Sequence, residues 1–353
     1  MSPNQQIRLK PIKVRSTGRF RPVVHTGHVY DRFGNIVQFG RILREAPFGR
    51  NKITLPGFAR LLQGTASTMV MVAGQGNTPP QETDTVLASY KGKTATVVSQ
   101  VTTRSTIPNA NNEVYWRTVY RMTFGPGSLG GGNVNVAEAA ISFGTSLSGV
   151  GAGTQVGARG LLVDASTNPT AIAVNNAVEY LDIIWEYTEW VPASVTGTVS
   201  LTIDGTPTNF DYEVRPYYFD NLGGSYNYAG WGPATNLVIP GYSPNAIKSG
   251  YGSQYASNAA AGPIGAITGD ALRGPPAANI PFSMTTDAYV ANSKQRTFRM
   301  TWLPLEGNIA GGIGLVHVNL GHSDWQIGFT PKIPKISTKQ LDLLFTYAMA
   351  NRP

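Results

Sequence analysis

The chain contains no cysteine, and this absence removes several classes of site at once. With no Cys among 353 residues, disulfide frameworks, thiol catalysis and cysteine-based zinc sites are excluded. A metal ion could be bound only through carboxylates and the four His. We therefore predict no cofactor and no metal site.

Charge is also scarce, since charged residues make up 14% of the chain and hydrophobic residues 41%. Ordinary soluble proteins have roughly 25% charged residues. The balance argues against global disorder, which goes with high charge and few apolar groups. No run approaches the roughly 18 apolar residues of a transmembrane helix, and no apolar stretch follows the first charges as in a secretory signal. We expect no membrane span.

What the chain does have is 40 Gly, 24 Pro and many aromatic residues, a composition that favours turn-rich β structure. Residues 114–124 and 178–190 alternate apolar and polar side chains with the period of two that is typical of half-buried strands. Further strands are predicted at 94–101, 134–143, 195–203, 295–303, 313–320 and 325–329. The predicted fold is all-β, an antiparallel β sandwich, with 55–62 as the best candidate for a short helix.

The C-terminal segment tests the choice between strand and helix. Ser337 and Gln340 imitate a helix capping box. The apolar side chains nevertheless recur at spacing two, which a strand would place on one face and a helix would scatter. These side chains are Leu341, Leu343, Phe345, Tyr347 and Met349. We predict a final strand, with Leu344 on its opposite face.

The first 60 residues carry twelve Lys or Arg against two acids, which leaves a net charge of −2 for residues 61–353. Residues 1–26 are predicted to form an extended basic arm outside the sandwich, which docks on a partner. Its partner-binding residues would be Arg8, Lys10, Lys13, Arg15, Arg19 and Arg21. An acidic face of another subunit is the favoured partner, ahead of nucleic acid and an anionic membrane surface.

The remaining chain divides at a long segment with few charges. Residues 27–215 would form the first part of the sandwich, 216–285 an insertion, and 286–353 the strands that complete the sandwich. Aromatic rings among Gly, Ser, Asn and Pro are typical of binding loops, so the insertion could contact another subunit, bind a receptor or glycan, or pack on its own sandwich. Its candidate residues are Tyr217, Tyr218, Tyr226, Tyr228, Trp231, Tyr242, Tyr251 and Tyr255.

No group of residues marks a catalytic centre. The pairs His25 with His28 and His317 with His322 are interpreted as hydrogen-bonded or exposed rather than as metal ligands. The Gly-rich stretch 144–160 lacks the Lys-Ser or Lys-Thr pair of a phosphate loop and is predicted to be an inter-strand loop. Asp182, Glu186 and Glu189 are interpreted as the solvent face of a strand. We predict that the protein is not an enzyme.

Several short sequence phrases, and their order along the chain, resemble those of a group of tailed-bacteriophage virion proteins. The first is the Asp31-Arg-Phe-Gly-Asn35 turn within 27–40, and a Gly-rich phrase ending in Asn-Thr-Pro-Pro follows at 72–80. The other phrases are 51–57, 84–87, 136–142, 158–162, 181–187 and 325–335. The resemblance covers roughly residues 27–203 and 286–353. One departure is Glu138-Ala-Ala-Ile, where the group has Gly-Leu after the Glu.

The resemblance implies a structural protein of the tail, collar or neck, located in the virion and assembled in the host cytoplasm. Its expected partners are further copies of itself and other virion proteins of the tail or neck. The alternative is a receptor-binding or tail-fibre protein, in which the aromatic insertion engages host surface glycan. No catalytic residue is implied.

Overall fold

The computed structural model describes residues 5–33, 35–63, 68–105, 108–144, 147–217, 255–257, 283–305, 312–319, 324–335 and 338–353. Within these ranges the chain is almost entirely β structure, with a single helix, α1 (Leu55–Gln63). The all-β prediction is therefore confirmed, and α1 begins at the residue that the sequence indicated. No helix in the described ranges has the length and apolar character needed to cross a membrane.

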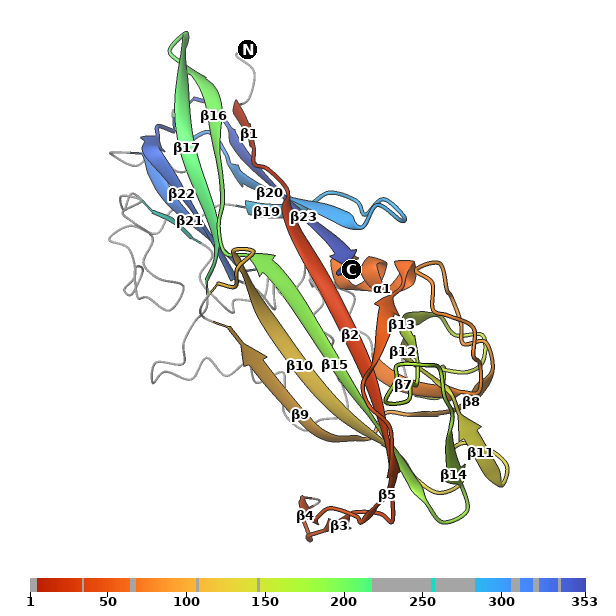
Figure 1. Ribbon diagram of the computed structural model, residues 1–353. Helices are drawn as coiled ribbons and strands as arrows, with labels where there is room; N and C mark the ends of the chain where they lie inside the picture. Colours follow the sequence, from red (N-terminus) through yellow and green to blue (C-terminus); the bar gives the residue numbers. More distant parts are fainter. Residues whose placement is uncertain are drawn as a thin grey trace.

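The strands form one large sheet, one smaller sheet and two short pairs (Figure 1). The 14-stranded sheet contains β1 (Gln5–Arg8), β2 (Ile12–His25), β5 (Ile42–Glu45), β6 (Gly49–Ile53), β7 (Thr68–Gly74), β8 (Tyr90–Thr94), β9 (Val97–Arg104), β10 (Glu113–Phe124), β12 (Glu138–Gly144), β13 (Val156–Leu161), β15 (Tyr180–Pro192), β19 (Ser283–Thr286), β20 (Gln295–Trp302) and β23 (Leu341–Asn351). The five-stranded sheet contains β16 (Val195–Ile203), β17 (Thr206–Tyr217), β22 (Asp324–Ile333), β21 (Ile313–Asn319) and β18 (Tyr255–Ser257). The pairs are β3 (Val29–Tyr30) with β4 (Ile36–Gln38), and β11 (Asn133–Val136) with β14 (Ile172–Asn175).

Strand β2 is the spine of the large sheet, so the prediction of a detached arm at residues 1–26 is wrong. One edge of β2 pairs antiparallel with β15. Along its other edge, β2 pairs in parallel with β23 through residues 12–16. Further along the same edge it pairs antiparallel with β6 and then with β5. The preceding strand β1 also pairs with β23. A strand with partners on both sides belongs to the folded body, so residues 12–25 cannot be removed without removing part of the sheet.

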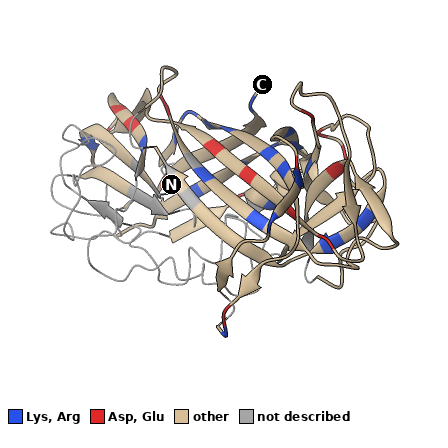
Figure 2. Ribbon diagram, turned by 60° about the horizontal axis from the view of Figure 1, so that its bottom comes forward, with Lys and Arg blue, Asp and Glu red and all other residues tan. Residues whose placement is uncertain are grey.

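The physical reason is a regular apolar face that the basic side chains conceal in the sequence. Ile12, Val14 and Phe20 lie in the core with at most 1% of their surface exposed. Several cations on the other face pair with acids of neighbouring strands: Arg15 with Glu113, Arg19 with Glu186, and Arg21 with Glu45. Lys10 donates to the carbonyl of Thr196 at 2.9 Å, whereas Arg8 and Lys13 are exposed. Figure 2 shows basic positions beside acidic ones along the strands of the sheet. That these six cations also bind a partner stays a prediction.

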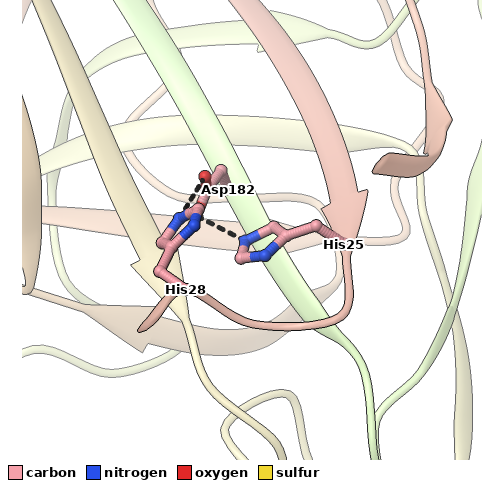
Figure 3. Close-up of side chains that lie close together, drawn as sticks. All are labelled: His25, His28 and Asp182. Atoms are coloured by element: carbon pink, nitrogen blue, oxygen red, sulfur yellow. Dashed lines mark hydrogen bonds and ion pairs between the residues drawn. The ribbon is translucent and has the colours of Figure 1, made fainter. Parts of the chain in front are cut away.

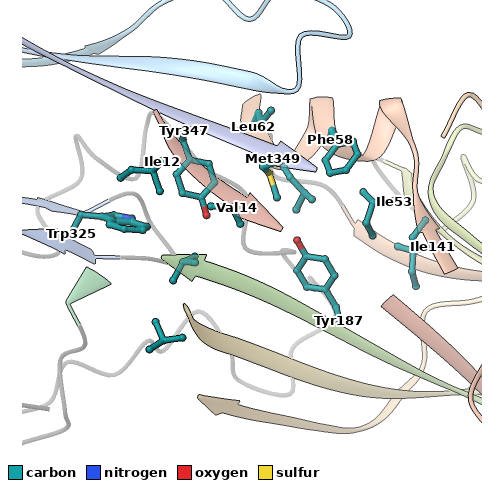
Figure 4. Close-up of a cluster of buried hydrophobic side chains, with 14 of the residues drawn as sticks. Ile12, Val14, Ile53, Phe58, Leu62, Ile141, Tyr187, Trp325, Tyr347 and Met349 are labelled. Carbon is teal, nitrogen blue, oxygen red and sulfur yellow. The ribbon is translucent and has the colours of Figure 1, made fainter. Parts of the chain in front are cut away.

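The core gathers side chains from both ends of the sequence (Figure 4). Ile12 and Val14 of β2 lie near Tyr347 and Met349 of β23, and Tyr187 of β15 points toward the same cluster. On the far side of the cluster, Phe58 and Leu62 of α1 are fully buried. The helix thus packs against the large sheet, where it contacts β13 and β20.

Most predicted strands are present, with adjusted limits. Residues 94–101 span the end of β8 and the start of β9, and residues 134–143 span β11 and β12. The Gly-rich stretch 144–160 contains most of β13, in which every residue is buried, so its prediction as a loop is partly wrong. Small residues let this strand run between β6 and β12.

The final strand is confirmed as β23, and Leu344 lies on the face opposite Leu343 as predicted, but that second face is buried as well. Leu341, Leu343 and Leu344 are each only 1% exposed. Strand β23 lies between β20 on one edge and β1 and β2 on the other, and both of its faces are covered. The alternation of side chains in the sequence therefore does not separate a buried face from a solvent face here.

The aromatic insertion falls largely outside the described residues. Tyr217 ends β17, opposite Asp324 of β22, and Tyr255 begins β18, opposite His317 of β21. The backbone at both ends of the insertion thus belongs to the five-stranded sheet. The other candidates lie outside the described residues: Tyr218, Tyr226, Tyr228, Trp231, Tyr242 and Tyr251.

Candidate functional site

The most distinctive surface of the described chain is the β3–β4 hairpin, which projects from the lower end of the molecule in Figure 1. Phe33 at its tip is 74% exposed and Val37 is 62% exposed. The large apolar side chains exposed between β2 and β5 are Val29, Tyr30, Phe33, Val37, Phe39 and Ile42. Several exposed apolar side chains on one projecting hairpin favour an interaction site, so we treat residues 28–42 as the docking hairpin.

The tip of the docking hairpin is held by the side chain of Asp31. Its Oδ1 accepts hydrogen bonds from the backbone N–H groups of Phe33 and Asn35, both at 2.8 Å, and its Oδ2 accepts one from the Asn35 amide at 3.0 Å. Asp favours such turns because its short carboxylate can bond to its own following backbone. These bonds hold Phe33 and Asn35 in place on either side of the tip.

The root of the hairpin is a buried cluster of His25, His28 and Asp182 (Figure 3). The two imidazole rings stack with centroids 4.1 Å apart. His28 Nε2 lies 3.2 Å from Oδ2 of Asp182. His25 Nε2 lies 3.0 Å from Oδ1, at ion-pair distance but without the alignment of a hydrogen bond. Arg121 and Thr123 of β10 donate to the same carboxylate, so Asp182 has four partners.

Backbone hydrogen bonds determine which nitrogen carries the proton in each neutral imidazole ring. The N–H of Gly27 donates to Nδ1 of His25 and the N–H of Gly40 donates to Nδ1 of His28, each at 3.0 Å. An imidazole nitrogen that accepts a hydrogen bond carries no proton, so each neutral ring must carry its proton on Nε2, facing Asp182. The pair is hydrogen-bonded, as the sequence analysis expected.

This arrangement does not suit a metal ion, although one atom from each of the three side chains lies within 4.8 Å of the others. A metal-binding His donates from its second nitrogen to an outer acceptor, whereas here that nitrogen accepts from the backbone. The guanidinium of Arg121 also already neutralises the carboxylate. The two His and Asp182 instead serve to hold the root of the hairpin.

The surroundings shift the pKa of two members of the cluster. Burial alone would raise the pKa of Asp182, but the contacts with His25 and Thr123 and the charge of Arg121 outweigh burial and lower the pKa below 3.8. Burial lowers the pKa of His28 below its ordinary 6.5; His25 and Arg121 add to this effect, and Asp182 opposes it. Both shifts favour a neutral His28 beside an ionised Asp182.

The cluster could not be recognised from the sequence, because the alternation in β15 predicted its carboxylates on a solvent face. Asp182 is fully buried and Glu189 is 2% exposed, where it accepts a hydrogen bond from Tyr187 at 2.7 Å. Glu186 is partly exposed and pairs with Arg19. Strand β15 has partners along both edges and is covered on both faces, so alternation did not indicate exposure. The one available signal was the coincidence of two His with the flanking Gly27 and Gly40.

A second buried network joins four of the phrases that carry the family resemblance. Arg159 donates to Glu138 through Nε at 2.9 Å and to Asp84 through Nη1 at 2.7 Å, and it also bonds to the carbonyl of Thr78. Glu138 in turn accepts from the N–H of Gly76 at 3.0 Å. Burial opposes the charge of Arg159, yet hydrogen bonds from its guanidinium to the two carboxylates raise its pKa. The network is saturated, so its groups serve the fold.

Comparison with known proteins found no match to a family model, to a curated protein or to a solved structure. The structure itself defines the class: an all-β protein with a large curled sheet and a projecting apolar hairpin.

Proposed function

We propose that this chain is a non-enzymatic structural subunit of a tailed-phage virion, a component of the tail, collar or neck that assembles with copies of itself and with neighbouring virion proteins. The observation that carries the proposal is the docking hairpin. It presents six exposed large apolar side chains on a root that is itself buried and held by hydrogen bonds from the backbone and by contacts with Asp182. A monomer that remained alone would gain nothing from keeping such a surface in water.

The convergence on Arg159 supports the proposal from a different direction. The phrases at 72–80, 84–87, 136–142 and 158–162, which are distant in the sequence, meet at one buried ion-pair network. A buried network that holds distant segments of the fold together is what would be expected of a structural subunit.

The position of β2 changes how subunits would be held. Because residues 12–25 belong to the central sheet, the proposal assigns the docking role to the hairpin at 28–42 instead of to a free basic arm. The aromatic insertion remains a second proposed contact, either with a subunit or with host glycan.

The test is the native mass of the purified protein by light scattering at tens of micromolar, followed by localisation with a specific antibody on purified particles. We expect an oligomer, or a monomer that is nevertheless found at the tail or neck of particles. A protein that is monomeric and also absent from purified virions would contradict the proposal.

A matched pair of substitutions tests the hairpin itself. Val37→Ser removes an exposed apolar group from the hairpin, whereas Val290→Ser removes a comparably exposed one, at 69%, from the turn between β19 and β20. Val37→Ser should reduce assembly or incorporation into particles, and Val290→Ser should not. Equal effects of the two changes would remove the hairpin from the proposal.

A further inference from the structure

We propose that the root of the docking hairpin is a proton-operated latch, in which uptake of a proton at Nδ1 of His28 breaks its bond to the N–H of Gly40 and frees the hairpin to change its pose. The inference concerns the root alone. Only its consequence for docking rests on the proposed function.

The geometry leaves one place for an added proton on His28. Its Nε2 already carries a proton toward Asp182, because its Nδ1 accepts the hydrogen bond from Gly40. A proton on Nδ1 turns that acceptor into a donor and sets it against the N–H of Gly40 at 3.0 Å. Two donors at that separation repel, so the bond must open.

The hydrogen bond from the N–H of Gly40 to His28 holds the segment that leads from β4 back to β5. Gly40 follows β4 and precedes β5, and its neighbour Arg41 exchanges hydrogen bonds with Thr26 on the opposite side of the root. The two sides are so close that a Cβ added at Gly40 would lie 2.2 Å from the carbonyl oxygen of Gly27. A shift of Gly40 therefore also moves the segment that joins β4 to β5.

The charges that face His28 come from four elements. Asp182 of β15 favours the protonated ring, whereas His25 at the end of β2 and Arg121 of β10 oppose it. Tyr30 of β3 packs against His28 edge to face at 6.3 Å between centroids, and Tyr180 of β15 stacks on His25 at 5.5 Å. The pKa of Tyr30 is raised, mainly by burial, so the Tyr30 ring is neutral near neutral pH.

The direction of the response follows from the lowered pKa of His28. A ring that binds protons more weakly when latched than when released favours the latched state above its ordinary 6.5, and this preference is lost as the pH falls below 6.5 toward the lowered value. For one proton, the equilibrium constant for opening increases by at most about tenfold per pH unit in that window.

The first test reads the proton positions directly. With 15N-labelled His in the full chain, long-range 1H–15N spectra at pH 7.5 should show His28 with its proton on Nε2 and an unprotonated Nδ1. Titration toward pH 5 should protonate Nδ1. A proton on Nδ1 at pH 7.5, or an unprotonated ring at every pH down to 5, would overturn the latch without any variant.

The second test follows the hairpin by hydrogen exchange, corrected for the intrinsic effect of pH, in peptides covering 26–44 and in a reference peptide from β10. In the wild-type chain, exchange of 26–44 should increase relative to the reference as the pH falls from 7.5 to 5. His28→Asn places an amide oxygen where Nδ1 accepts and cannot titrate, so its exchange should be independent of pH. The same pH dependence in both proteins would contradict the proposal.

The variant Val37→Ser separates the latch from the docking role. It alters the exposed surface and leaves the root intact, so the hydrogen-exchange profile of Val37→Ser should follow that of the wild type. If Val37→Ser assembles normally, the docking role fails and the latch stands. If His28→Asn keeps the wild-type pH dependence, the latch fails and the docking role stands.

Discussion

The guanidinium of Arg159 is bound by the carboxylate of Glu138, with Nη2 and Oε2 2.8 Å apart, and both side chains are at most 2% exposed. Glu138→Ala would remove one of the two carboxylates that neutralise the buried guanidinium and would leave the N–H groups of Gly76 and Ser89 without their acceptor. We expect a loss of about 3–5 kcal/mol in the free energy of unfolding, as is typical when one partner of a buried ion pair is removed. Urea denaturation measures the loss.

A double change provides the control for that prediction. Glu138→Leu with Arg159→Met removes both charges and should recover part of the loss, because neither group is left unpaired. Glu45→Gln, which breaks the exposed pair with Arg21, should cost about 1 kcal/mol or less. A similar loss in Glu138→Ala and Glu45→Gln would refute a structural role for the Arg159 network.

The placement of β2 in the core predicts a contrast between two adjacent residues. Val14 is 1% exposed, whereas Lys13 points to solvent. Val14→Asp should lower the free energy of unfolding by about 3–5 kcal/mol, since apolar burial is lost and an unpaired charge is buried. Lys13→Asp should change it by about 0.5 kcal/mol or less. Equal tolerance of both changes in thermal unfolding would restore the detached arm.

Strand β23 predicts that neighbouring positions are equally sensitive. Leu343 and Leu344 point to opposite faces, and both are buried. Leu343→Asp and Leu344→Asp should each cost several kcal/mol, about the cost of a lost Leu side chain and a buried charge. Ala350→Asp, at an exposed position near the end of the strand, is the control and should be mild. A mild Leu344→Asp would mean that the second face is open.

The lowered pKa of Asp182 predicts a loss of stability in acid. Because this carboxyl binds protons more weakly in the folded chain than its ordinary 3.8 would allow, its contribution is present above 3.8 and is lost as the pH falls through the folded value. Asp182→Asn should remove that pH-dependent component. At neutral pH it should cost about 3 kcal/mol, because Arg121 is only partly exposed and loses its counter-charge.

Urea midpoints between pH 3 and pH 7 for wild type and Asp182→Asn give the measurement. The two stability curves should converge as the pH falls. Parallel curves would show that the ionisation of Asp182 is not linked to folding.

The parts of the fold that the sequence predicted are those in which a local pattern decides the structure. Helix α1 begins at Leu55, as predicted, because its apolar residues recur at helical spacing within nine positions. Strands β10 and β15 alternate over a dozen positions and were recognised for the same reason.

The errors share one cause, which is that long-range pairing decides whether a face is covered. In β2 the basic side chains concealed the apolar face, and the acids that neutralise these cations come from β10, β15 and β5. The same limitation concealed the cluster at the root of the docking hairpin, in which His28 and Asp182 are separated by 154 positions. No local pattern connects such residues.

The parallel pairing of β2 with β23 also has a consequence for how the chain is made. Residues 12–16 of β2 have one of their partner strands more than 300 positions further along the chain: Ile12 lies opposite Tyr347, and Asn351 bonds to Ile53 across 298 positions. During translation these residues of β2 leave the ribosome long before β23 does, and one edge of the segment lacks its final partner until β23 emerges. Strand edges without partners are prone to pair with other chains, so a nascent chain should depend on chaperones until β23 has left the ribosome.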